Sequence, residues 1–169
     1  MAETVESAYL AAVLGVLRQY KAMAERAVAQ AGADAAFRVT DAEANSIAVL
    51  LRHMAGNMRS RWTDFLTTDG EKPDRNRDAE FELDAGTTLD QVMAWWEDGW
   101  RRTFAALEGL GPGDLLREVR IRGEPHSVVR AIERQLAHYA YHVGQIVLLA
   151  KQARGPAWET LSLPRRKRV

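Results

Sequence analysis

Three of the four histidines in the chain have the spacing expected of metal ligands. His138 and His142 stand four residues apart in the apolar run RQLAHYAYHVGQIVLLA, and His53 lies far upstream in IAVLLRHMAGNM. Four residues make about one helical turn, so the pair projects from one helix face. Together with a third imidazole from a neighbouring helix, the pair would give one ion three neutral nitrogen donors and leave positions open for water or substrate. The pattern indicates a reactive metal centre rather than a purely structural one.

A second interpretation of these histidines stays open. A histidine in an amphipathic helix is often a surface residue or a hydrogen-bonded core residue, and a pair at this spacing also arises by coincidence. On a helical wheel, however, His53 and the pair each lie at the margin of the apolar face of their helix. The fourth histidine, His126, precedes the last helix beside Pro125, and we expect it in a loop or at the helix N-terminus rather than in the metal site.

Polar residues near the histidines are candidates for binding a cofactor or substrate. Asn57 and Arg61 follow His53 by one and two helical turns, so we expect them to hydrogen-bond a ligand or to orient an anionic substrate. Gln145 follows His142 by three residues and is expected to contact that histidine on the side away from the metal. Structural support of the bundle is the alternative role for all three residues.

Apolar residues at helical spacing predict four long helices, at residues 4–31, 40–68, 87–109 and 127–154. Thr40 followed by Glu43 predicts a capping box at the start of the second helix. The segment LREVRIRGEPHS before the last helix predicts a short ribbon or an extended loop. We therefore expect an all-α protein, a four-helix bundle forming one domain over residues 1–169. Residues 155–169 form a tail, part of which Trp158, Leu161 and Leu163 are expected to pin to the body.

The charged segment DGEKPDRNRDAEFELDAG between the second and third helices has two interpretations. In the first, it is an exposed connection between antiparallel helices. In the second, it folds over the open end of the metal groove, and Arg75 or Arg77 binds the carboxylates of a thiol cofactor.

Charge and cysteine content exclude several classes of function. Lysine plus arginine and aspartate plus glutamate both total 23, so no overall field attracts nucleic acid or an anionic membrane. Four of the positive charges belong to residues 165–168, a basic tail that we expect to be solvated. There is no cysteine, so any thiol chemistry needs an external thiol. With neither a basic, apolar leader nor a run of eighteen apolar residues, we expect a cytoplasmic protein.

The helical His53, the segment HYAYHVGQI that contains the other two histidines, and the four-helix plan resemble the DinB/YfiT-like superfamily of bacterial metal-binding bundles. A closer resemblance is to a branch described as a domain of unknown function, in which segments similar to NSIAVLLRHMAGNMRSRW and WETLSLP recur. The resemblance covers nearly the whole chain. It implies an up-down-down-up bundle, often dimeric, in which His53, His138 and His142 hold a divalent metal.

Two classes of function follow. Some members of the superfamily are thiol-dependent transferases or isomerases that use bacillithiol, mycothiol or glutathione, so the resemblance implies a metal-dependent thiol S-transferase or a related isomerase or hydrolase acting on a small molecule. The alternative is a non-catalytic, stress-associated metal-binding protein that works as a homodimer or through a protein partner. Zinc, nickel and iron all accept histidine ligands, so the metal stays open. Because no acid/base pair or nucleophile motif is present, no catalytic residue is assigned.

Overall fold

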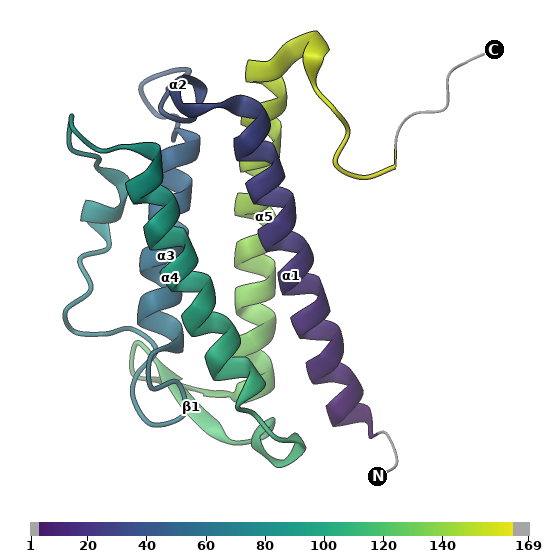
Figure 1. Ribbon diagram of the computed structural model, residues 1–169. Coiled ribbons are helices and arrows are strands. Elements are labelled where there is room, and N and C mark those ends of the chain that lie inside the picture. Colours follow the sequence, from purple (N-terminus) through teal and green to yellow (C-terminus); the bar gives the residue numbers. More distant parts are fainter. Residues whose placement is uncertain (1–3, 164–169) are drawn as a thin grey trace.

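Four long helices lie side by side and contain most of the regular structure (Figure 1). The computed structural model describes residues 4–163. The chain is mostly helical, as predicted, and adds one small antiparallel sheet of two strands. In chain order the elements are α1 (Val5–Ala31), α2 (Ala33–Ala36), α3 (Ile47–Trp62), the 3-10 helix η1 (Asp78–Phe81), α4 (Leu89–Glu108), η2 (Pro112–Asp114), β1 (Glu118–Ile121), β2 (Glu124–Ser127), α5 (Val128–Arg154) and η3 (Gly155–Ala157).

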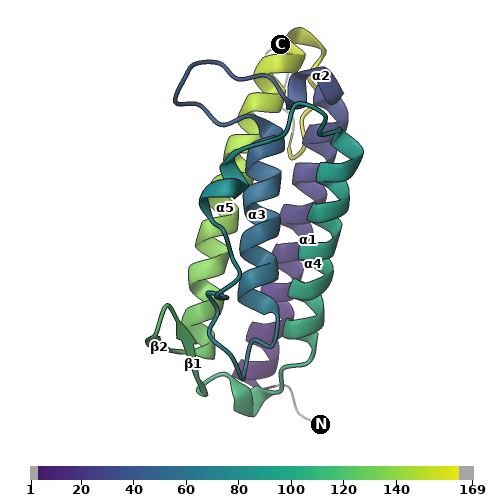
Figure 2. The ribbon, with the colours of Figure 1, turned by 90° about the vertical axis from the view of Figure 1, so that its left-hand side faces the viewer.

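The direction of the helices determines the path of the chain between α3 and α4. Helices α1 and α5 run one way along the long axis, and α3 and α4 run the other way (Figure 1). Because α3 and α4 are parallel, residues 63–88 must return along the length of α3 before α4 begins, and Figure 2 shows this link crossing in front of α3. The interpretation of the link as a connection between antiparallel helices was therefore wrong.

Most helix ends coincide with the capping signals in the sequence. The Thr4 hydroxyl accepts a hydrogen bond from the Ser7 amide at the start of α1, and the Thr88 hydroxyl accepts one from the Gln91 amide at the start of α4. Each caps an otherwise unpaired backbone N–H group. Helix α1 ends at Gly32, which adopts a positive φ of 79° that a residue with a Cβ adopts only with strain.

The predicted start of the second helix was wrong. Helix α3 begins at Ile47, and its cap is Ser46, whose hydroxyl accepts a hydrogen bond from the Val49 amide. Thr40 and Glu43 lie in a turn instead, because the Asp41 carboxylate accepts the Glu43 amide in a local turn that competes with the helix.

The C-terminal end of α3 also comes earlier than predicted, at Trp62 rather than Thr68. Thr63 has extended backbone, and Asp64 has a positive φ of 47°. These two conformations interrupt the helical hydrogen bonding and turn the chain into the returning link.

The predicted ribbon is a β-hairpin next to the start of α5. Strand β1 pairs antiparallel with β2, with Ile121 opposite Glu124. The two residues of the turn, Arg122 and Gly123, have positive φ values of 56° and 77°. Two positive φ values in a two-residue turn match the right-handed twist of paired strands. His126 lies in β2, in neither a loop nor a capping position, while Ser127 caps α5.

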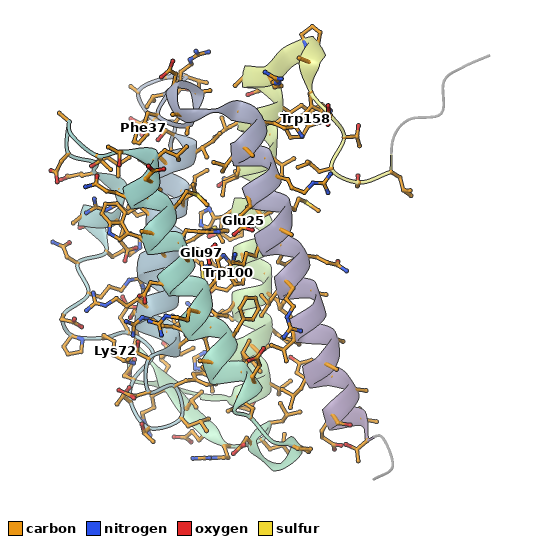
Figure 3. The ribbon with its side chains drawn as sticks, in the orientation of Figure 1. Glu25, Phe37, Lys72, Glu97, Trp100 and Trp158 are labelled. Carbon is orange, nitrogen blue, oxygen red and sulfur yellow. The ribbon has the colours of Figure 1, made fainter. Side chains whose placement is uncertain are left out.

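The interior is one continuous cluster of apolar side chains contributed by all four long helices. Trp96 and Trp100 are fully buried, and Figure 3 shows Trp100 in the interior, between the long helices. Trp62 is also buried, whereas Trp95 is 39 % exposed. Among residues 4–163, no helix has both the length and the apolar character needed to cross a bilayer.

Part of the C-terminal tail packs on α1, as expected. Trp158 and Leu161 contact the core, and Figure 3 shows Trp158 near the C-terminal end of α1. The amide side chain of Gln30 exchanges two hydrogen bonds with the backbone of Glu159, at 2.9 and 2.8 Å. Leu163 is 91 % exposed, so its predicted role in pinning the tail was wrong. The basic run 165–168 lies outside the described residues.

Two helical glycines provide a test of the packing between α3 and α4. A Cβ atom at Gly99 would lie 3.2 Å from Ala55 Cα and 3.2 Å from Met58 Cβ, whereas a Cβ atom at Gly15 in α1 would meet nothing within 4 Å. Alanine gains up to about 1 kcal/mol over glycine in a helix, and overpacking costs about 1–3 kcal/mol. We predict that Gly15→Ala stabilises the protein and that Gly99→Ala destabilises it by about 1 kcal/mol in urea unfolding. Equal stabilisation by both changes would contradict the close approach of the two helices.

Candidate metal centre

His53 from α3 meets His138 and His142 from α5 in one cluster. Their Nε2 atoms converge: His138 Nε2 lies 3.4 Å from His53 Nε2 and 3.1 Å from His142 Nε2. One donor atom from each residue lies within 4.8 Å of the other two. Residues that are 85 positions apart in the chain are thus brought together by the packing of α3 against α5.

The spacing and chemistry of these atoms fit a metal ion. Two nitrogens that each lie about 2.1 Å from one ion are separated by about 3.4 Å in tetrahedral geometry and about 3.0 Å in octahedral geometry. The two observed separations fall in this range. Three imidazole nitrogens are donors that first-row divalent metals accept, and His53 and His142 are buried, with exposures of 4 % and 7 %. These residues therefore fit a divalent ion.

Hydrogen bonds at the opposite ring nitrogens orient two of the three imidazoles. His53 Nδ1 donates to Glu80 Oε2 at 2.9 Å, and His142 Nδ1 donates to Gln145 Oε1 at 2.9 Å. A proton on Nδ1 leaves the lone pair on Nε2, which is the form that binds a metal through Nε2. Nδ1 of His138 is buried and has no partner among the described residues. Gln145 therefore lies where the sequence analysis placed it, behind His142.

Glu80 lies in η1 and belongs to the link between α3 and α4. Its carboxylate accepts from Arg75 at 2.7 and 2.8 Å as well as from His53, and Arg75 also donates to Glu71. Burial raises the pKa of the Glu80 carboxyl, but the hydrogen bonds from Arg75 and His53 outweigh burial and hold the pKa below its ordinary value. The neighbouring ring of Phe81 stacks on His53 with 4.6 Å between centroids. The link thus covers one side of His53.

The two histidines on α5 are kept neutral by their surroundings. The pKa of His138 is lowered to about 3, chiefly by burial and also by repulsion from the neighbouring cationic groups, which are His142 and His53 when protonated and the more distant Arg75 and Arg61. Burial also lowers the pKa of His142, against the opposing effect of its hydrogen bond with Gln145. A metal competes with protons for imidazole nitrogen, so neutral rings are ready to bind at neutral pH.

Asn57 belongs to a buried network beneath the histidines. Its side-chain oxygen accepts from Gln135 at 2.6 Å and from the Tyr139 hydroxyl at 3.4 Å. The Tyr139 hydroxyl in turn accepts from Trp62 at 2.9 Å. Tyr139 is fully buried. The network joins α3 to α5 and fixes the distance between the helices that carry the three histidines.

A cavity of about 330 Å³ opens beside the histidines. Its lining includes two of them, His53 and His138, and the two predicted neighbours Asn57 and Arg61. Arg61 is buried with 3 % exposure. Arg75 and Arg77 from the link also line this cavity, and Arg75 is held by ion pairs with Glu71 and Glu80. The cavity has the size of a small-molecule site.

Sequence reasoning missed Glu80 and Gln135. Glu80 is one of eight acidic residues in the link, and nothing local distinguishes it from the others. Chemistry offered one signal: the second ring N–H group of a metal-binding histidine usually donates a hydrogen bond to a carboxylate or carbonyl group. A carboxylate near His53 could therefore have been expected. For Gln135 the signal was its place one helical turn before His138 and Tyr139 on α5.

Comparison with known proteins gives a family for this chain. Residues 4–167 match the family described as "Protein of unknown function (DUF1572)". The chain belongs to this family. The comparisons with curated proteins and with solved structures find no match for this DUF1572 protein.

The Glu80 carboxylate should contribute strongly to the stability of this DUF1572 protein. Removing one partner from a buried, hydrogen-bonded charge pair costs about 3–5 kcal/mol, because Arg75 and His53 lose their acceptor. We predict that Glu80→Ala lowers the free energy of unfolding of the metal-free protein by that amount in urea titration. Glu82→Ala is the matched control, since Glu82 is exposed in the same link. Equal effects of the two changes would contradict the role of Glu80.

Acid should destabilise the metal-free protein before its carboxylates titrate. The pKa of His138 is about 3 in the folded protein and has an ordinary value of 6.5, so the unfolded chain binds the proton first. Stability is complete above pH 6.5 and falls as the pH drops towards 3, with a slope approaching about 1.4 kcal/mol per pH unit for one proton. We predict a shallower loss between pH 6.5 and 4.5 in His138→Asn, measured by urea unfolding at each pH. Parallel curves for the two proteins would contradict this assignment.

Proposed function

We propose that this protein is a divalent-metal-binding bundle in which His53, His138 and His142 hold the ion, and that it is a metal-dependent enzyme using an external low-molecular-weight thiol. The reaction proposed is thiol S-transfer or a related isomerisation or hydrolysis of a small molecule. The observation that carries the proposal is the convergence of three Nε2 atoms at 3.1 and 3.4 Å beside a cavity.

The path of the chain supports the relationship that was inferred from sequence. Helices α1 and α5 run opposite to α3 and α4 (Figure 1), which is the up-down-down-up order expected of the DinB/YfiT-like superfamily. The ligand positions, one on α3 and two on α5, also agree with what the resemblance implies. We therefore propose that the DUF1572 chain is a four-helix bundle of this superfamily.

The residues around the histidines have separate tasks in this proposal. When bound, the ion supplies Lewis-acid activation that lowers the pKa of a thiol or water. Glu80 and Gln145 hold the imidazoles of His53 and His142 in the orientation that exposes Nε2. The chain has no cysteine, so the thiol must come from solution through the cavity.

The alternative is a non-catalytic protein in which the ion stabilises the bundle. A structural zinc site has four protein ligands, whereas a catalytic one keeps a position for water or substrate. Within residues 4–163, the cluster that offers suitable donor atoms consists of three histidines, and the cavity reaches two of them. These two observations favour the enzyme. We propose zinc, nickel or iron as the ion and a homodimer as the oligomeric state.

Metal analysis tests the ligand set directly. We predict about one divalent ion per chain in untagged wild-type protein purified without chelator, because three histidines form one site. His53→Ala and His138→Ala should each lose the ion, measured by inductively coupled plasma mass spectrometry. His126→Ala is the control, since His126 lies in β2 outside the cluster. Full metal content in His53→Ala, or no metal in wild type after reconstitution, would contradict the proposed site.

Turnover separates the two functions once the ion is identified. The metal-loaded protein should accelerate conjugation of bacillithiol, mycothiol or glutathione to an electrophile, and His53→Ala should lose this acceleration together with its metal. A metal-loaded protein without activity towards any of these thiols would favour the structural alternative.

A further inference from the structure

The cavity beside the histidines is strongly cationic. Five arginines line it, and its lining contains no carboxylate among the described residues. They come from four parts of the fold: Arg61 from α3, Arg75 and Arg77 from the link, Arg122 from the hairpin turn and Arg134 from α5. The chain as a whole has no net charge, so this concentration is local.

Only part of this positive charge is neutralised by neighbouring acids. Arg75 is bound by Glu71 and Glu80 and serves the histidine cluster. Arg77 lies 3.7 Å from Asp78, and Arg122 lies 3.6 Å from Glu71. Both pairs are long and both arginines are exposed, so each pair has little energetic value.

Arg61 and Arg134 have no ion pair within residues 4–163, which leaves an excess of positive charge at the cavity. Arg134 is exposed, whereas Arg61 is buried. The buried member of this pair is the one that needs a physical explanation.

Arg61 is the most informative of the five. Its side chain is buried, with 3 % residue exposure, and its Nε and Nη1 atoms have no hydrogen-bond partner in the described part of the chain. The backbone of the link covers it closely, because a Cβ atom at Gly70 would lie 2.4 Å from Nη1. Burial lowers the pKa of Arg61, yet a guanidinium remains charged at neutral pH. A buried charge with unused donors is costly unless a ligand completes it.

The hairpin turn presents a second arginine to the same cavity under backbone strain. Arg122 has a φ of 56°, in the left-handed region that asparagine and glycine occupy at lower cost. The Asp69 carboxylate of the link accepts the Arg122 and Gly123 amides at 2.8 and 2.7 Å and so fixes the turn. An arginine held in this conformation at a cavity wall is typical of a functional position.

We propose that this cavity is an oxyanion subsite that binds a small-molecule carboxylate or phosphate ester through Arg61, with Arg122 and Arg134 at its rim. The planar guanidinium fork matches both of these groups, and the volume of about 330 Å³ admits a metabolite-sized ligand. Because His53 and His138 line the same cavity, an anion held there has another part of its structure beside the metal ligands. Its role as the substrate subsite rests on the proposed function, whereas anion binding itself does not.

Isothermal titration of the full chain tests the subsite, with inorganic phosphate and succinate as separate probes. Measurements at one low ionic strength, on metal-free and metal-loaded protein, separate binding at arginine from binding at the ion. We expect Arg61→Gln to weaken binding by about 10- to 100-fold, the loss expected for charge-assisted hydrogen bonds. Arg59→Gln is the matched control: Arg59 is on the same helix, pairs with Asp74 on the surface and does not line this cavity.

Folding of the variants is checked by urea unfolding. Arg61→Gln should be at least as stable as wild type, since it removes a buried charge without a partner. If it does not fold, Arg134→Gln replaces it, because Arg134 is exposed, and a several-fold loss of affinity is then expected.

The outcomes separate this inference from the proposed function. Stronger binding of phosphate than of succinate identifies a phosphate ester as the ligand class, and the reverse identifies a carboxylate. If the metal-free protein binds a probe and Arg61→Gln weakens that binding, the subsite is supported. This result holds even if the protein binds no metal, in which case only the proposed function is contradicted. Metal-loaded protein that binds neither probe, or equal affinity in wild type and Arg61→Gln, overturns the subsite.

Discussion

The buried carboxylate of Glu80 joins the link, helix α3 and the histidine cluster. It stays ionised because Arg75 and His53 both donate to it, and either bond alone would leave a buried charge partly unsatisfied. The proton held on His53 Nδ1 directs the lone pair of Nε2 towards α5. The orientation of His53 within the histidine cluster therefore depends on a residue that lies outside the cluster.

Most of the fold follows from short-range signals. Apolar residues at helical spacing, hydroxyl caps such as Thr88 and terminal glycines such as Gly32 are read over a few residues, and those helix ends fall where they were expected. The start of α3 was misjudged because Thr40 and Ser46 are both acceptable caps, and the choice depends on the turn that Asp41 forms. Sequence patterns do not rank such competing local structures.

The parts of the site that stand on the helices, namely the histidines and their neighbours Asn57, Arg61 and Gln145, were predictable from the sequence. The separation of His138 and His142 by four residues is a local property, and pairing them with His53 needs only the packing of two amphipathic helices. The role of Glu80 and the burial of Arg61 depend on how a polar link folds over α3, and the sequence has no periodicity in that segment from which its path follows. Glu80 and Arg61 become buried only when the folded link packs on α3, so their burial cannot be read from the local sequence.

The returning link also divides the site into a fixed part and a variable part. The three imidazoles stand on long helices that share one core, where a substitution is felt throughout the packing. Two of the cavity arginines, Arg75 and Arg77, lie instead on a connection whose exposed positions can change at small cost to the core. Substitutions at these exposed positions would therefore alter the charge of the cavity while the histidine cluster keeps its geometry.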